Sequence, residues 1–127
     1  MRRSRLAVLV GMTCLLPAMS WAEVPSSLRG DAAVYHATRF TGRPMANGVP
    51  FNPNHSVAAH LTLPLGTVAR VTNLRNGATT TVVISDRGPH TPGRILDLSP
   101  RAARDIGIRG GVTPVEITPV ARQFASR

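Results

Sequence analysis

Asp86 is the residue of this sequence whose type and surroundings best suit proton-transfer chemistry. It follows the apolar run Val82-Val83-Ile84 and precedes Arg87-Gly88-Pro89. We therefore expect its carboxyl at the end of a strand, partly out of water. Desolvation disfavours the charged form of a carboxyl, so a group in such a place can act as a general acid. The alternative is that Asp86 only closes a Gly-Pro turn, a common use of Asp.

Two further side chains are candidates for chemistry. His60 ends an apolar stretch before a turn, and a lone histidine in that place is either a site residue or a structural one. Asp97 alternates with Leu96 and Leu98, and we interpret it as a buried carboxylate that accepts backbone or arginine hydrogen bonds. The four histidines of the chain lack the helical spacing of metal ligands, so neither a metal nor a cofactor is expected.

The composition excludes several other chemistries. All 15 basic residues are Arg, so a P-loop, which needs Lys, cannot be present. The chain also lacks the Gly-x-Ser-x-Gly elbow of serine hydrolases. Against the 15 arginines stand 6 acidic residues, which gives a net charge of +9 and indicates an anionic partner.

Residues 1–22 have the three-part pattern of a secretory signal peptide: early arginines, an apolar run from Leu6 to Leu16, and the small-x-small site Ser20-Trp21-Ala22. The apolar run is shorter than the roughly 20 residues that span a bilayer, so no membrane segment is expected after cleavage. Lipid attachment at Cys14 stays open as an alternative. We expect an exported protein, in a periplasm or outside the cell, and a wall polymer rather than nucleic acid as its partner.

Short strands must position these side chains. The clearest are residues 67–74 and 79–84, which are rich in β-branched side chains and flank Asn76-Gly77, a pair typical of a type I′ turn. Further strands are expected at residues 32–40, 94–98 and 112–120. The last of these contains Pro114 and Pro119, which strands tolerate near their ends or at a sheet edge.

The remaining elements are a helix and a long loop. Ser99 as N-cap, Pro100 at the first helical position and Gly107 as a stop predict a helix over residues 100–106. Turn residues crowd the segment from 42 to 55, which predicts an exposed loop suited to binding. We therefore expect a flexible lead-in at 23–33, a compact all-β barrel with one small helix at 34–120, and a tail at 121–127, in a monomer.

Five short motifs, in this order, resemble the rare lipoprotein A (RlpA) family over about residues 35–120. They are Ala58-Ala59-His60, residues 63–67, residues 71–77 with Asn76-Gly77, Asp86-Arg87-Gly88-Pro89, and residues 94–99. The resemblance implies a six-stranded double-psi β-barrel, as in expansins. It also implies an endolytic peptidoglycan lytic transglycosylase that acts on glycan strands stripped of stem peptides. Such enzymes cleave without water, by attack of the muramyl C6 hydroxyl, and leave anhydro-muramyl ends.

The resemblance also implies roles for individual residues. Asp86 matches the family's acid, which serves as both acid and base, and His60 matches a site histidine. The sequence departs from the family at Val49, where the family usually has Glu. A non-catalytic, expansin-like glycan binder is therefore the alternative function. In either case we expect substrate contacts from one group of residues: Arg39, Arg43, Asn47, Phe51, Arg87 and Arg94.

Overall fold

Six strands and two short helices make up the described part of the chain. The computed structural model describes residue 24 and residues 26–122, so the expected signal peptide, with Cys14, and residues 123–127 of the expected tail lie outside the described residues. The elements are, in order, β1 (Leu28–Val34), α1 (Ala37–Phe40), β2 (Val57–Ala59), β3 (Thr67–Asn73), β4 (Thr79–Asp86), β5 (Arg94–Leu98), α2 (Pro100–Asp105) and β6 (Thr113–Arg122).

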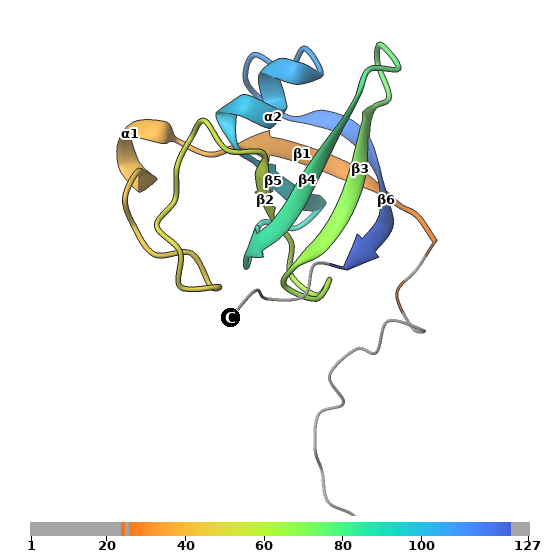
Figure 1. Ribbon diagram of the computed structural model, residues 1–127. Helices are drawn as coiled ribbons and strands as arrows, with labels where there is room; N and C mark the ends of the chain where they lie inside the picture. Colours follow the sequence, from red (N-terminus) through yellow and green to blue (C-terminus); the bar gives the residue numbers. More distant parts are fainter. Residues whose placement is uncertain (1–23, 25, 123–127) are drawn as a thin grey trace, which may run out of the picture.

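The strands close into one barrel in the order β1-β5-β2-β4-β3-β6, with β6 returning to β1 (Figure 1). Two of the pairings, β1 with β5 and β2 with β4, are parallel, and the others are antiparallel. Closure leaves no free sheet edge. The predicted all-β class and the six-stranded barrel are therefore confirmed.

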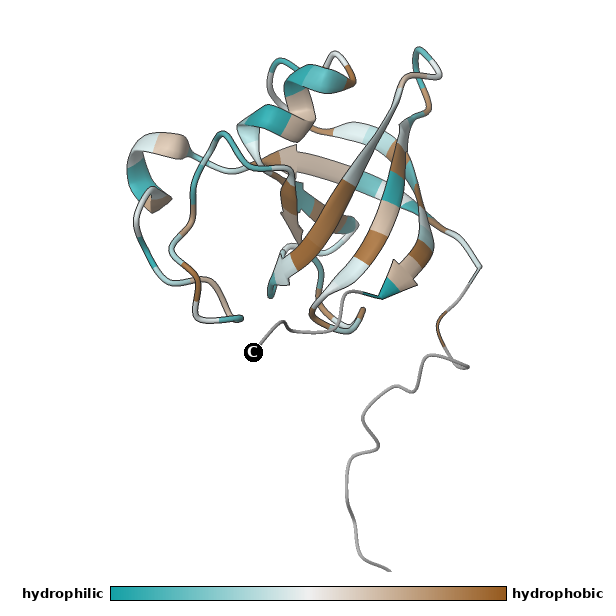
Figure 2. Ribbon diagram, viewed as in Figure 1, coloured by the Kyte–Doolittle hydropathy of each residue, from teal (hydrophilic) through white to brown (hydrophobic). Residues whose placement is uncertain are grey.

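Alternating side chains of the strands fill the barrel. In β3, for example, Thr67, Ala69, Val71 and Asn73 are buried while the residues between them are not, which is the period of two that a strand imposes. Figure 2 shows apolar bands along the strands, whereas α1 carries both hydrophilic and apolar residues. Among the described residues, no helix has the length and apolarity needed to cross a membrane.

The predicted helix is confirmed, as α2. Ser99 is its N-cap, and the Ser99 Oγ accepts hydrogen bonds from the Ala102 N–H at 3.3 Å and the Val57 N–H at 3.4 Å. The helix therefore begins at a residue that also binds β2. Gly107 follows the helix with a φ of +75°, a conformation that glycine adopts without steric cost.

Two predictions near the start of the barrel are wrong. Residues 28–33 are not a lead-in but most of β1, which lies between β5 and β6. Residues 37–40, expected in a strand, form α1 instead. The structure explains Gly30 within β1, because a Cβ there would lie 2.7 Å from the side chain of Ile95. The first residues of β1 include Arg29, Gly30 and Asp31, which do not have the apolar pattern of a strand, so the sequence did not indicate one there.

The connection between β3 and β4 also differs from the prediction. A type I′ turn needs a positive φ at both central residues, but of the pair only Gly77 has one. The Asn76 side chain instead donates to the Ile106 carbonyl at 3.1 Å and accepts from the Ala78 N–H at 2.9 Å. These bonds tie the hairpin tip to the end of α2, and this long-range contact decides the turn.

The two prolines of β6 are accommodated in different ways. Pro114 is the second residue of the strand, as expected near an end. Pro119 lies inside β6, which extends to Arg122, and it pairs with Ala69 where the register shifts. Proline cannot donate a ladder hydrogen bond, and the shift in the pairing of β3 with β6 accommodates Pro119, so the sheet edge expected for it is not needed.

Candidate active site

The Asp86 carboxylate is the centre of the site. It lies half-buried at the end of β4 and accepts three hydrogen bonds. Its Oδ1 accepts from the backbone N–H of Ala46 and of Arg87, both at 2.9 Å, and its Oδ2 accepts from the Tyr35 hydroxyl at 2.8 Å. Asp86 therefore does more than close its own turn, because it connects β4 to the long loop and to the residue that follows β1.

Tyr35 is a site residue that sequence analysis missed. Its ring contacts Phe51, with 4.8 Å between centroids, and Phe40 edge-on at 5.5 Å. Burial, the hydrogen bond to Asp86, and the charges of Asp86 and Asp97 raise the pKa of Tyr35 far above its usual value. Tyr35 thus stays protonated and donates to Asp86. The one signal in the sequence was that Tyr35 is the only tyrosine of the chain.

The strand register brings the two aspartates to the same level of the barrel. Ala59 of β2 pairs with Asp86 of β4 on one side and with Asp97 of β5 on the other. Neighbouring strands lie about 4.8 Å apart, so the two aspartate Cα atoms are separated by about 10 Å. Ala33 of β1 extends the row on the far side of Asp97. Only small side chains, Ala33 and Ala59, accompany the two acids.

A cavity of about 710 Å³ opens beside this row. Its walls come from the end of β1, α1, β5 and the turn before β6, and Tyr35 belongs both to these walls and to the hydrogen bonds of Asp86. Asp86 therefore lies one hydrogen bond behind the cavity wall. The lining residues are Ala33, Val34, Tyr35, His36, Arg39, Phe40, Arg94, Asp97, Arg109, Gly110, Gly111 and Val112.

Asp97 is bound by an arginine and also lines the cavity, which the sequence did not indicate. Its Oδ1 accepts from Arg94 Nη2 at 2.5 Å, which confirms the arginine partner, but Asp97 is only partly buried, whereas a buried carboxylate was expected. Both side chains also line the cavity. Arg94 Nε is buried and has no acceptor among residues 24 and 26–122, so Asp97 alone fixes this guanidinium in the described structure.

His60 is a buried neutral histidine. Its Nδ1 accepts from the N–H groups of Thr62 at 3.1 Å and Leu63 at 3.0 Å, so its proton lies on Nε2. Burial and the nearby charge of Arg87 lower the pKa of His60 to about 4. Its backbone N–H donates to the Asp86 carbonyl at 3.2 Å, and its ring does not line the cavity. His60 therefore shapes the turn beside Asp86.

Arg87, expected to bind substrate, is engaged within the protein. Its Nη1 donates to the carbonyls of Leu63 at 2.6 Å and His60 at 3.0 Å. The guanidinium thus closes the segment from 60 to 63 against the end of β4. Arg87 and His60 together hold the backbone that surrounds Asp86.

The other expected binding residues divide into exposed and buried ones. Arg39 and Arg43 are exposed, and their guanidinium carbons lie 5.6 Å and 6.0 Å from the centroid of Phe40. Phe51 is only 3% exposed, so its ring supports Tyr35 and is closed to a ligand. Asn47 is exposed, and its Oδ1 accepts from the Val49 N–H at 3.0 Å.

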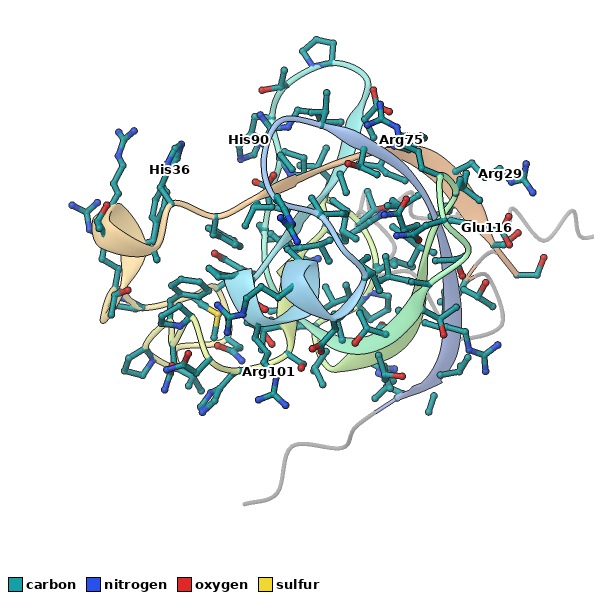
Figure 3. All side chains as sticks on the ribbon, turned by 90° about the horizontal axis from the view of Figure 1, so that it is seen from above. Arg29, His36, Arg75, His90, Arg101 and Glu116 are labelled. Carbon is teal, nitrogen blue, oxygen red and sulfur yellow. The ribbon has the colours of Figure 1, made fainter. Side chains whose placement is uncertain are left out.

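Val49, where the sequence departs from the RlpA family, and Glu116, the acid of β6, both lie outside the cavity lining. Val49 lies in the loop that bonds to Asp86 through Ala46, and its side chain is 49% exposed. Glu116 pairs with Arg29 at 2.6 Å on the side of the barrel away from α1 and His36 (Figure 3). Glu116 is therefore paired with Arg29 and does not line the cavity. Among the described residues, no three His, Cys, Asp or Glu side chains gather as metal ligands.

Comparison with known proteins identifies the family. A family model described as lytic transglycolase matches residues 27–117, which is most of the chain. The chain belongs to this family. Lytic transglycolase relatives include the probable endolytic peptidoglycan transglycosylase RlpA of Nostoc sp., 48% identical over 109 residues that cover 84% of this chain and 29% of the relative. The resemblance to the RlpA family is therefore confirmed.

Other relatives and solved structures agree with this assignment. The endolytic peptidoglycan transglycosylase RlpA of Pasteurella multocida is 48% identical over 97 residues, 74% of this chain and 33% of the relative. The chain thus spans about a third or less of these two relatives. The apo expansin of Clavibacter michiganensis matches with a TM-score of 0.58 and 23% identity, over 78% of this chain and 52% of that one. The expansin match supports the double-psi barrel fold.

Proposed function

We propose that this lytic transglycolase family member is an exported endolytic peptidoglycan lytic transglycosylase acting on glycan strands stripped of stem peptides. The observation that carries the proposal is the link between Asp86 and the cavity. A carboxylate at a strand end accepts a hydrogen bond from Tyr35, which lines a cavity of about 710 Å³. That volume lies within the range of about 300–1,000 Å³ typical of ligand sites. The names of the RlpA relatives support the reaction class.

One carboxyl can carry both proton transfers of this reaction. The reaction starts from the protonated form of Asp86, which donates its proton to the glycosidic oxygen as the bond from C1 of the muramyl sugar to that oxygen breaks. The resulting carboxylate then takes the proton of the muramyl C6 hydroxyl as the C6 oxygen bonds to C1. The acid is regenerated, and the products are an anhydro-muramyl end and a new glycan end with a free hydroxyl. Water takes no part, so no carboxylate is needed to activate it.

The surrounding residues position Asp86 for this reaction. Tyr35 and the N–H groups of Ala46 and Arg87 fix both carboxylate oxygens. His60 is neutral at cytoplasmic or periplasmic pH because the pKa of His60 is lowered to about 4, so it supplies no proton. Its contribution is to hold the turn at residues 60–63, which Arg87 fastens from the other side.

The source of the oxygen that becomes bonded to C1 of the muramyl sugar tests the proposal. Amidase-treated glycan strands are incubated with the purified chain in water enriched in ¹⁸O, and the products are measured by mass spectrometry. The expected products are anhydro-muramyl ends without ¹⁸O. Products that carry ¹⁸O at a reducing muramyl end would show hydrolysis instead and would contradict the proposal.

Glycan binding without cleavage is the alternative, and Val49 is the observation that favours it. The position where the family usually has Glu carries an exposed apolar side chain beside the Asp86 loop. A binder of this kind would hold anionic glycan through exposed arginines, and salt would weaken its binding by screening. Retention on wall sacculi that falls with salt, without any new anhydro-muramyl ends, would establish this alternative.

A further inference from the structure

The charge of the large cavity is unusual for a sugar site. Three of its lining residues are arginines, Arg39, Arg94 and Arg109, whereas Asp97 is its only acidic lining residue. Asp97 pairs with Arg94 at 2.5 Å, so these two charges offset each other. The cavity is left with the two positive charges of Arg39 and Arg109. A neutral sugar has no charge that could pair with these two guanidinium groups.

Both of these arginines are available to a ligand. Arg39 and Arg109 are exposed, and neither forms a salt bridge with any residue in the described part of the chain. Arg39 comes from α1 and Arg109 from the turn that leads into β6, so they belong to walls formed by different parts of the chain. Two guanidinium groups on separate walls suit an anion held between them, since each can bind a carboxylate with two parallel N–H donors.

A second cavity places Arg109 along an extended path. This cavity has a volume of about 580 Å³ and is lined by residues of α2 and the segment after it. Val34 and Arg109 line both cavities. The two hollows are therefore neighbours, and Arg109 stands at their boundary. A ligand longer than one sugar would pass this arginine.

We propose that Arg39 and Arg109 form a carboxylate site that binds the lactyl carboxylate of a muramyl residue. The inference rests on the proposed function, because it names a substrate group recognised in the cavity whose wall residue Tyr35 binds Asp86. In an intact wall the lactyl carbonyl forms an amide bond with the stem peptide, so it has no charge. Removal of the peptide leaves a carboxylate on the muramyl sugar. The arginine pair therefore recognises the charge that only a stripped strand carries at this position.

The direct test compares two ligands that differ at this group alone. Glycan oligosaccharides from amidase-treated strands carry free lactyl carboxylates, and coupling to methylamine converts these groups to neutral amides. Binding of each is titrated to the full chain carrying Asp86→Asn, so that cleavage does not consume the ligand. We expect the acid form to bind about tenfold more tightly than the amide form, a difference of about 1.4 kcal/mol.

Arginine variants then locate the effect. Arg39→Gln with Arg109→Gln should abolish the preference for the acid form and leave the affinity for the amide form within about twofold. Arg70→Gln with Arg75→Gln is the matched control, because Arg70 lies on β3 and Arg75 in the hairpin after it (Figure 3), and neither lines a cavity. This control also removes two positive charges and should keep the preference.

Each outcome bears on one claim. Equal binding of acid and amide forms by the Asp86→Asn chain would overturn the carboxylate site. A loss of preference with the Arg70 and Arg75 control as large as with the Arg39 and Arg109 variant would overturn it as well. A preserved preference in a chain that produces no anhydro-muramyl ends would overturn the cleavage proposal and leave the carboxylate site standing. Cleavage of the acid and amide forms at equal rates by the unmodified chain would overturn the carboxylate site and leave the cleavage proposal standing.

Discussion

The hydroxyl of Tyr35 offers a sharp test of how the site is held together. Tyr35→Phe removes one oxygen atom, the donor to Asp86 Oδ2 at 2.8 Å, and keeps the ring that packs on Phe51 and Phe40. The substitution therefore changes one hydrogen bond and creates no sizeable cavity. Asp86 keeps its two backbone donors, the N–H groups of Ala46 and Arg87.

The expected magnitude follows from the type of bond. A hydrogen bond to a charged group contributes about 1.5–3 kcal/mol to the free energy of unfolding. The lower value applies here because Asp86 and Tyr35 are half-buried, and water can replace part of the lost bond. In a domain of this size each kcal/mol shifts Tm by about 4–8 °C. Tyr35→Phe should therefore lower Tm by about 6–12 °C.

Thermal unfolding and steady-state kinetics measure the two effects. We expect kcat on stripped glycan strands to fall by about tenfold, because a misplaced proton donor loses the advantage of orientation. Thr80→Val is the control: it removes a hydroxyl that donates to the carboxylate of Asp105 at 3.2 Å, away from the cavity. The control should change neither Tm by more than a few degrees nor kcat. Unchanged Tm and kcat in Tyr35→Phe would refute the reasoning.

Three further predictions concern pH, position 49 and the cap of α2. The pKa of His60 is about 4 in the folded protein and 6.5 in the unfolded one, so between these pH values only the unfolded state binds the proton. The free energy of unfolding should therefore fall by at most about 3 kcal/mol as pH drops from 6.5 to 4, measured by urea unfolding. Val49→Glu should raise the cleavage rate on the order of tenfold, measured by release of anhydro-muramyl products, because it puts the acid that the family usually has into the loop that bonds to Asp86. Ser99→Ala should lower the unfolding free energy by about 1–2 kcal/mol, also in urea, because the Ala102 and Val57 N–H groups lose their acceptor.

Each of these predictions has its own control. His90→Gln, which replaces an exposed histidine, should leave the pH dependence of unfolding intact, and a flat profile in the unmodified chain would contradict the role of His60. Val49→Gln matches the size of Glu without its charge and should not raise the rate. A rate unchanged by Val49→Glu would show that position 49 does not serve the reaction. A loss below about 0.5 kcal/mol for Ser99→Ala would contradict the cap.

Local signals in the sequence predicted the elements whose structure is decided locally. Residues 67–73 and 79–86 are rich in β-branched side chains, which favour strands wherever they stand in the chain. Ser99, Pro100 and Gly107 likewise delimit α2 within one residue, since caps act over one turn. The parallel pairing of β1 with β5 joins residues about 60 positions apart, and no local pattern encodes it. The start of β1 was misassigned for this reason.

The site was predictable only in part, for the same physical reason. Asp86 was found because a carboxyl after an apolar strand has a local signature. Tyr35 was missed, since the bond that defines its role spans 51 residues. Arg109 was missed as well, because its turn contributes to the cavity only once the barrel has closed. Phe51 is one of the expected substrate contacts, but its ring is buried against Tyr35, a contact that no local pattern indicates.

The rate of a chain carrying Asp86→Asn tests the central claim most directly. The amide keeps the shape of the carboxyl but cannot exchange the proton that the reaction requires. Anhydro-muramyl ends released from amidase-treated strands are counted by mass spectrometry for the unmodified chain, for Asp86→Asn and for Asp105→Asn, an exposed acid on α2. The account predicts that Asp86→Asn loses a hundredfold or more, on the order of the contribution of general acid–base catalysis, and that Asp105→Asn loses nothing. A rate in Asp86→Asn within a few-fold of the unmodified chain would contradict it.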